Sequence, residues 1–232
     1  MWITDVFHEY APKGDYLLAS FLKSDEQKIN LLESMANVTF PQYYREFLLF
    51  CGGNKCPIFE HLPATFDVDG LISTYEEYDE FPEDFPCNDW FIIGAGYFGI
   101  DILMNLKTQK MIEGDSEETG VFLSSSFIDF FKQRLFLKLC ILDEIESFSF
   151  SVSKAISNEL SYEIDSDILK LCEKYSKIDR LLSDKRQKIF KGNDINIYVS
   201  FDDYSNIIYL SGKDSEKFIS DLKEKVTLVN VK

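Results

Sequence analysis

The chain of 232 residues and 27.0 kDa is long enough for one large domain, or for one ordinary domain with an appendix. Hydrophobic residues make up 45% and aromatic residues 15%, which provides ample material for a core and excludes a disordered protein. The net charge of −16 repels phosphate groups and therefore excludes nucleic acid and anionic membranes as expected partners.

The charge is concentrated in the first part of the chain. Residues 1–140 hold 23 acidic and 10 basic side chains, whereas residues 141–232 hold 17 acidic and 14 basic ones, so the net charges are −13 and −3. Such a field speeds the approach of a basic partner and says nothing about the fold. We therefore expect a cationic partner to meet the first part of the chain.

The N-terminal residues lack the basic region and apolar run of a targeting signal, and nowhere do about 18 apolar residues follow one another. We expect a cytoplasmic protein without a membrane segment. Residues 1–23 contain apolar clusters but no element that their pattern assigns.

The cysteines predict buried free thiols. They are odd in number and widely spread: Cys51, Cys56, Cys87, Cys140 and Cys172. There is no Cys-x-x-Cys pair, and the only histidines are His8 and His61, so we expect no metal site. A Cys–His nucleophilic pair stays open, although neither histidine lies in a recognisable signature.

The first elements that the pattern predicts are two short helices. Ser24 and Gln27 have the spacing of a capping box, and apolar residues follow at helical spacing until Asn37. A second helix starts with Pro41 at its first position, where the missing N–H costs least. It ends at residues 52–54, which tolerate left-handed geometry.

An acidic run follows between Thr65 and Asp89. It contains nine carboxylates, namely Asp67, Asp69, Glu76, Glu77, Asp79, Glu80, Glu83, Asp84 and Asp89. No lysine or arginine occurs between Lys55 and Lys107. Residues 67–70 are similar to a calcium loop but lack its third ligand and terminal glutamate, so we expect no calcium. Two interpretations remain: a solvated face, or an acidic contact surface that carries tyrosines.

Residues 88–105 are predicted to form two strands joined through Gly94, Gly96 and Gly99. These glycines spell G-x-G-x-x-G after an apolar run, as in a dinucleotide-binding site. That site requires a helix that begins within the glycines, whereas residues 100–105 alternate with a period of two. We therefore predict a bulged strand-to-strand connection that uses glycine's access to positive φ, and no nucleotide or other cofactor.

The first domain is predicted to close with further strands and a helix. Residues 107–110 make a polar turn, residues 111–112 resume extended chain, and residues 121–123 form a short strand. Residues 124–126 cap a helix, which ends the domain near Leu142. That helix has an apolar stripe typical of a core, formed by Phe127, Phe130, Phe131 and Leu135.

Residues 143–232 are predicted to form a small α+β unit. A long helix carries Ile168, Leu171, Cys172, Tyr175, Ile178 and Leu182 at helical spacing. Residues 195–199 and 207–210 alternate on either side of a turn-rich segment and predict a hairpin. A helix with Phe218, Ile219 and Leu222 and a strand at residues 226–229 complete the unit.

Four motifs in the first part resemble the SUKH superfamily, the Smi/Knr-like domain of fungal cell-wall regulators and many bacterial immunity proteins. FPQYYREFL at 40–48 is similar to the family's Leu-Pro-x-x-Tyr-x-x-Phe-Leu, with phenylalanine first. CGGN at 51–54 matches its Asn-Gly-Gly turn without the leading asparagine. WFIIGAG at 90–96 resembles its strand and glycine turn, and SFIDFF at 126–131 its closing helix. The resemblance covers roughly residues 24–140.

The resemblance implies an α+β fold in which a SUKH-like domain, residues 1–142, has N-terminal helices, an antiparallel or mixed sheet and a closing helix. Residues 143–232 lie outside it and match no family that we identify. It also implies a binding module with no catalytic set, hence no enzyme. Bacterial members commonly neutralise a cognate toxin of a polymorphic or contact-dependent system, so we expect an immunity protein. The alternative is a regulatory scaffold that binds signalling or cell-envelope proteins.

The acidic run is the expected contact surface for a protein toxin, which its charge predicts to be basic, for example a nuclease. Buried tyrosines would serve as anchors in that contact. The predicted contact residues are Asp67, Asp69, Tyr75, Glu76, Glu77, Tyr78, Asp79, Glu80, Glu83 and Asp84.

Overall fold

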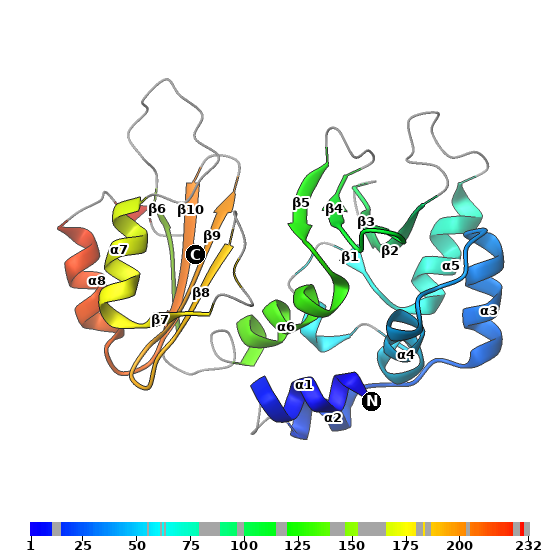
Figure 1. The fold of residues 1–232 in the computed structure, drawn as a ribbon, viewed down its shortest axis with the longest axis horizontal. Coiled ribbons are helices and arrows are strands. Elements are labelled where there is room, and N and C mark those ends of the chain that lie inside the picture. The colour runs from blue at the N-terminus through cyan, green and yellow to red at the C-terminus, as the bar shows by residue number, and fades with distance from the viewer. Residues whose placement is uncertain are drawn as a thin grey trace. The chain divides into compact units, whose positions relative to one another are not determined.

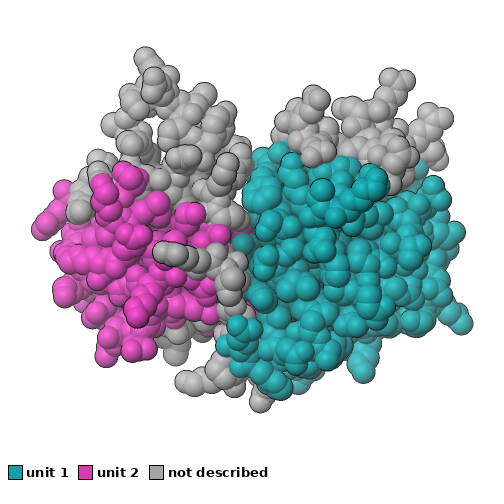
Figure 2. Space-filling model, viewed as in Figure 1, with its two compact units in different colours: residues 1–134 teal, residues 135–232 magenta. Residues whose placement is uncertain are grey.

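The computed structural model confirms the α+β class: its described residues form eight α-helices and two antiparallel sheets (Figure 1). The structure describes residues 1–10, 15–54, 56–60, 62, 64–78, 89–96, 100–114, 120–139, 147–152, 166–179, 183, 187–202, 205–224 and 228–229. The chain divides into two compact units, Met1–Arg134 and Leu135–Lys232, which Figure 2 shows in different colours. Whether a boundary at residue 142 separates independently folding domains stays a prediction.

Unit 1 contains a five-stranded sheet of order β1-β2-β3-β4-β5 with antiparallel neighbours. Its elements are α1 Trp2–Tyr10, α2 Asp15–Ser20, α3 Glu26–Met35, α4 Gln42–Cys51, the 3-10 helix η1 Pro57–Phe59, β1 Ala64–Thr65, α5 Val68–Glu77, β2 Trp90–Gly96, β3 Ile102–Asn105, β4 Met111–Glu113, β5 Val121–Ser124 and α6 Phe127–Leu137, which continues past the boundary between the units. The predicted order of two helices, a strand meander and a closing helix is therefore present, with α1, α2 and α5 in addition.

The predicted caps are close to the observed ones. The carboxylate of Asp25, not Ser24, caps α3 by accepting a hydrogen bond from the Lys28 N–H at 2.9 Å. Pro41 is the N-cap of α4 instead of its first helical residue. At the N-terminal start of α6, the Ser126 hydroxyl accepts the Asp129 N–H at 3.1 Å, as a capping serine does.

Helix α5 begins inside the acidic run, to which the sequence pattern had assigned no secondary structure. Asp67 is its N-cap and accepts the Gly70 N–H at 2.8 Å, so the segment that resembled a calcium loop is a helix start. Val68, Leu71 and Tyr75, at positions i, i+3 and i+7, form the buried face of the helix. This spacing is visible in the sequence. We did not predict a helix from it because acidic residues surround the three apolar ones.

Strands β2 and β3 pair antiparallel as predicted, with a bulge between Ile92 and Gly94. The reason for the glycines is different, because neither Gly94 nor Gly96 has a positive φ. A Cβ on Gly94 would lie 2.9 Å from the Phe66 ring, and one on Gly96 would lie 1.8 Å from the Ile100 carbonyl oxygen. Close packing therefore requires these glycines; Gly99 lies outside the described residues.

Aromatic rings fill the core of unit 1. The Phe127 ring of α6 lies 4.9 Å from Phe47 and 5.1 Å from Tyr44 of α4, measured between ring centroids. Trp2 of α1 lies 5.1 Å from Phe131 and donates its indole N–H to the Tyr43 carbonyl at 3.0 Å. The stripe predicted as core is fully buried, and α1, which the sequence pattern left unassigned, completes it.

Unit 2 contains a six-stranded sheet of order β11-β6-β10-β9-β8-β7, larger than the predicted hairpin and final strand. Its elements are β6 Ser147–Val152, α7 Ser166–Tyr175, β7 Lys177–Ile178, β8 Gln187–Lys191, β9 Asn196–Asp202, β10 Ser205–Ser211, α8 Ser215–Lys223 and β11 Leu228–Val229. Figure 1 shows α7 and α8 on one face of the sheet. The predicted hairpin is β9 and β10, the predicted helix is α8, and β11 falls within the predicted last strand.

The helix that we predicted to carry Ile168 through Leu182 is shorter in the structure. Helix α7 ends at Tyr175, and Ile178 belongs to strand β7, where it pairs with Phe190. Between them, the buried Ser176 donates its hydroxyl to the Ile195 carbonyl at 2.6 Å, which holds the chain where it changes direction. Leu182 lies outside the described residues.

Candidate protein-binding surface

Six of the ten predicted contact residues lie in or beside α5. They are Asp67, Asp69, Tyr75, Glu76, Glu77 and Tyr78. Asp79, Glu80, Glu83 and Asp84 lie outside the described residues. We call residues 76–84 the acidic segment. Helix α5 packs against β2 and against α3, so these neighbours decide which carboxylates are compensated.

At the N-terminal end of α5, the carboxylates already have partners. Asp69 forms an exposed ion pair with Lys28 of α3 at 2.7 Å, and this hydrogen bond raises the pKa of Lys28. At the far end of the acidic run, Lys107 lies 2.6 Å from Asp89. The sequence had suggested that the run has no base nearby. The structure corrects this, because Lys28 and Lys107 reach the run from other parts of the chain.

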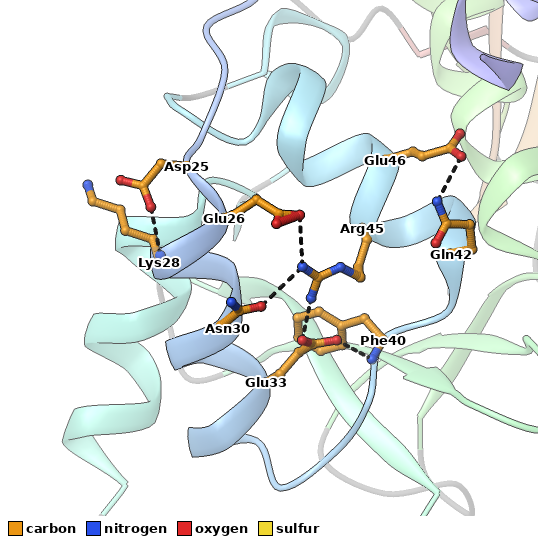
Figure 3. A network of polar contacts seen from close by, with 9 residues as sticks. All are labelled: Asp25, Glu26, Lys28, Asn30, Glu33, Phe40, Gln42, Arg45 and Glu46. Carbon is orange, nitrogen blue, oxygen red and sulfur yellow. Dashed lines mark hydrogen bonds and ion pairs between the residues drawn. The ribbon is translucent and has the colours of Figure 1, made fainter.

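Arg45 of α4 compensates the acids on α3 (Figure 3). Its guanidinium pairs with Glu33 and, at 3.1 Å, with Glu26, and it donates to the Asn30 side chain at 3.1 Å. Glu33 also accepts the Phe40 N–H at 2.7 Å. The arginine side chain is 20% exposed, so the cluster mainly joins α3 to α4 and offers little free charge to a partner.

At the C-terminal end of α5 the charge is uncompensated. Glu76 and Glu77 are exposed, and within the described part of the chain no ion pair involves either of them. In the sequence they are followed by the four further acids of the acidic segment. A basic partner would therefore meet the strongest negative potential of α5 at this end.

Tyr75 cannot contact a partner in this structure, contrary to our expectation. Its side chain is 7% exposed, and its hydroxyl accepts the Ile92 N–H of β2 at 2.9 Å. Burial raises its pKa. The i, i+3, i+7 spacing that makes it apolar core was readable from the sequence, but its hydrogen bond to β2 was not. Tyr78 is half-buried and donates its hydroxyl to Asp101 at 2.9 Å.

The described part of the glycine connection, Gly94 and Gly96, does not have the geometry of a nucleotide site. The chain continues from β2 towards β3, and no helix begins at Gly94 or Gly96. The Gly96 N–H, a group that such sites offer to phosphate, donates to the Asp101 carboxylate at 2.9 Å. A phosphate would have to displace a buried carboxylate of the same charge.

The described cysteines are buried free thiols, as predicted: Cys51, Cys56 and Cys172. Burial raises the pKa of the Cys51 thiol well above its usual range, which keeps it in the protonated, weakly nucleophilic form. His8 is exposed on α1, and His61, Cys87 and Cys140 lie outside the described residues. Among the described side chains, no group of three or more histidines, cysteines and carboxylates could hold a metal ion.

The order of helices, antiparallel meander and closing helix defines unit 1 as an α+β domain whose helix α5 presents an acidic end. Residues 23–133 match the SMI1 / KNR4 family (SUKH-1), so this part of the chain is a SUKH-1 domain, as the four motifs predicted. No curated protein matches the chain. In the described residues, no helix is long and apolar enough to cross a membrane.

Proposed function

We propose that the protein is an immunity protein that binds and neutralises a cognate protein toxin through its SUKH-1 domain. The observation that carries the proposal is the family match over residues 23–133, because bacterial members of this family commonly act in that way. Binding, and no catalysis, is the activity that we assign to it.

The acidic segment supports a basic toxin, such as a nuclease. Exposed carboxylates at the end of α5 would attract it, and an acidic surface can cover the cationic groove with which a nuclease holds nucleic acid. The regulatory members of the same family support the alternative of a scaffold that binds signalling or cell-envelope proteins. Gene neighbourhood separates the two, since an immunity gene lies directly downstream of a large toxin gene.

The test is rescue of growth. The C-terminal domain of the toxin encoded directly upstream is expressed in a bacterial host, with and without this protein. We expect the toxin domain to stop growth, co-expression to restore it, and the two purified proteins to form a complex. An unrelated protein of similar net charge serves as the control. If growth is not restored and no complex forms, the proposal is wrong.

A further inference from the structure

The last turn of α5 is tied to the sheet at two points. Tyr75 accepts the Ile92 N–H from β2, and three residues later Tyr78 donates to Asp101, each at 2.9 Å. Residues i and i+3 lie on the same side of a helix, so both tyrosines face the sheet. Glu76 and Glu77, between them in sequence, are exposed.

Asp101, which accepts the hydrogen bond from Tyr78, is itself held in place by other contacts. Its side chain is 5% exposed, and each carboxylate oxygen accepts one hydrogen bond, from Gly96 N–H and from the Tyr78 hydroxyl. Its carbonyl oxygen accepts the Gly114 N–H at 2.8 Å. A buried carboxylate is costly unless it is hydrogen-bonded, and charge-assisted bonds are stronger than neutral ones. The buried charge therefore favours keeping the Tyr78 hydroxyl in place.

Tyr78 stands where the helix stops. Its N–H still donates to the Thr74 carbonyl at 3.2 Å, but its own φ of −83° and ψ of 89° have left the helical range. Tyr78 is therefore the residue at which the helical geometry of α5 ends. Next to Asp101 in sequence, Ile100 is one of the few large apolar side chains that are exposed among the described residues, at 53%.

We propose that Tyr78 and Asp101 are positioning residues: their hydrogen bond holds the end of α5 in the conformation that a basic protein partner recognises. This inference rests on the proposed function. Glu76 and Glu77 supply the charge that attracts the partner, and the exposed Ile100, which precedes Asp101 in sequence, offers the partner an apolar contact. Tyr78 acts through the carboxylates and does not serve as the buried anchor expected from sequence.

Binding kinetics distinguish the positioning role of Tyr78 from the electrostatic role of Glu76 and Glu77. Charge steers association, whereas a pre-organised surface lowers the cost of forming the complex and is seen mainly in its lifetime. Tyr78→Phe, which removes only the hydroxyl, should speed dissociation of the toxin domain about three- to tenfold. The association rate constant and its dependence on salt should stay as in the wild type.

Binding is measured by surface plasmon resonance at several salt concentrations, with the toxin domain encoded upstream as the probe. Tyr43→Phe is the matched control, because among the described residues the only hydrogen-bond contact of the Tyr43 hydroxyl is to the Met104 sulfur, at 3.7 Å. If Tyr78 and Asp101 act as one unit, their effects on binding are not additive. Asp101→Asn should then weaken binding less when it is added to Tyr78→Phe than when it is made in the wild type. Hydrogen exchange of the free protein should be faster at the Tyr78 amide in Tyr78→Phe.

A loss of global stability would lower the amount of active protein without changing the rate constants of the folded molecules. If Tyr78→Phe dissociates like the wild type while the wild type binds, the inference is overturned and the proposed function stands. If the wild type does not bind, the proposed function fails and takes the inference with it.

Discussion

Units 1 and 2 differ in how many large aromatic rings they bury. Of the largest fully buried side chains among the described residues, three lie in unit 2, namely Phe136, Phe190 and Phe218. The others lie in unit 1 and come from elements far apart in the sequence: Phe7, Tyr44, Phe47, Phe59, Phe66, Phe91, Phe127, Phe130 and Phe131. The core cluster of unit 2 is mostly aliphatic and comprises Ile168, Leu171, Cys172, Phe190, Ile195, Ile197, Val199, Ile208, Leu210, Phe218 and Leu222. Aromatic side chains are large, so they can pack between helices and strands that are far apart in the sequence.

The units also differ in how they treat their charges. Acids in unit 2 meet lysines of the same unit, in the pairs Lys174–Asp221 at 2.6 Å, Lys191–Asp179 at 3.5 Å and Lys213–Asp194 at 2.5 Å. In unit 1, Lys28 and Arg45 compensate the acids around α3, and Lys107 pairs with Asp89, whereas in the described part of the chain no ion pair involves Glu76 or Glu77. Because residues 1–140 also carry most of the net negative charge, the comparison supports our proposal that unit 1 attracts a basic partner.

The comparison is tested most directly by separating the units. A truncated chain that ends at Asp143 keeps α6 complete and should fold if unit 1 is an independent domain. Far-ultraviolet circular dichroism and a cooperative urea transition would show this. An insoluble or molten product, beside a cooperative full-length chain, would mean that the units share a core.

A cavity in each core should have the next largest effect. Phe47→Ala in unit 1 and Phe218→Ala in unit 2 each remove a fully buried ring, and each should lower the free energy of unfolding by about 3–5 kcal/mol. If the units unfold separately, each substitution lowers the midpoint of only one of two calorimetric transitions. A single transition that both substitutions shift equally would contradict independence.

Tyr75→Phe tests whether that side chain belongs to the core or to the contact surface. The ring stays, but the Ile92 N–H on β2 loses its acceptor, so unfolding should become easier by about 1–3 kcal/mol. Tyr43→Phe, whose hydroxyl has only a long contact to sulfur, should cost much less. Equal urea midpoints for both variants would show that the Ile92 hydrogen bond adds little.

Charge reversal tests the role of the acidic segment. Glu76→Lys with Glu77→Lys and Glu80→Lys should slow association with the toxin domain about tenfold, which corresponds to about 1.4 kcal/mol, and should abolish protection of cells. The difference should shrink as salt is added, and thermal stability should not fall.

The matched control for charge reversal lies in unit 2, where Glu173, Glu216 and Glu224 are also exposed. Reversing these three charges changes the net charge by the same amount and should leave association close to that of the wild type. If both triple variants bind and protect normally at every salt concentration, the acidic segment is only a solvated face.

Alkaline pH should weaken unit 1 slightly. Burial raises the pKa of Tyr43 to about 12, above the value of 10.0 for the unfolded chain, so the folded state holds this proton more tightly. The stabilisation is complete below pH 10 and is lost as the pH rises from 10 towards 12. Tyr43→Phe should reduce the fall in unfolding free energy between pH 8 and 11 by about 1 kcal/mol or less after solvent screening. The unfolding free energy is measured by urea titration at each pH. If it falls equally in Tyr43→Phe and in the wild type between pH 8 and 11, this assignment is wrong.

The sequence by itself determined the elements whose signals are local. Apolar residues at helical spacing, with a cap, located α3, α4 and α6, and strand alternation located β2, β3 and the β9–β10 hairpin. The same local signals supported the resemblance to the SUKH family. The i, i+3, i+7 face of α5 was equally local, but the surrounding carboxylates dominated its interpretation.

Only the tertiary structure decided which of those local groups have partners. Lys28 lies 41 residues from Asp69 in sequence, and Tyr75 lies 17 residues from Ile92. A periodic pattern can place each side chain on a face of its own element, but it cannot say which distant element supplies the opposite charge or the missing acceptor. For that reason the acidic run was readable from sequence, whereas the tertiary structure alone showed that Asp69 and Asp89 have lysine partners and that, among the described residues, Glu76 and Glu77 have none.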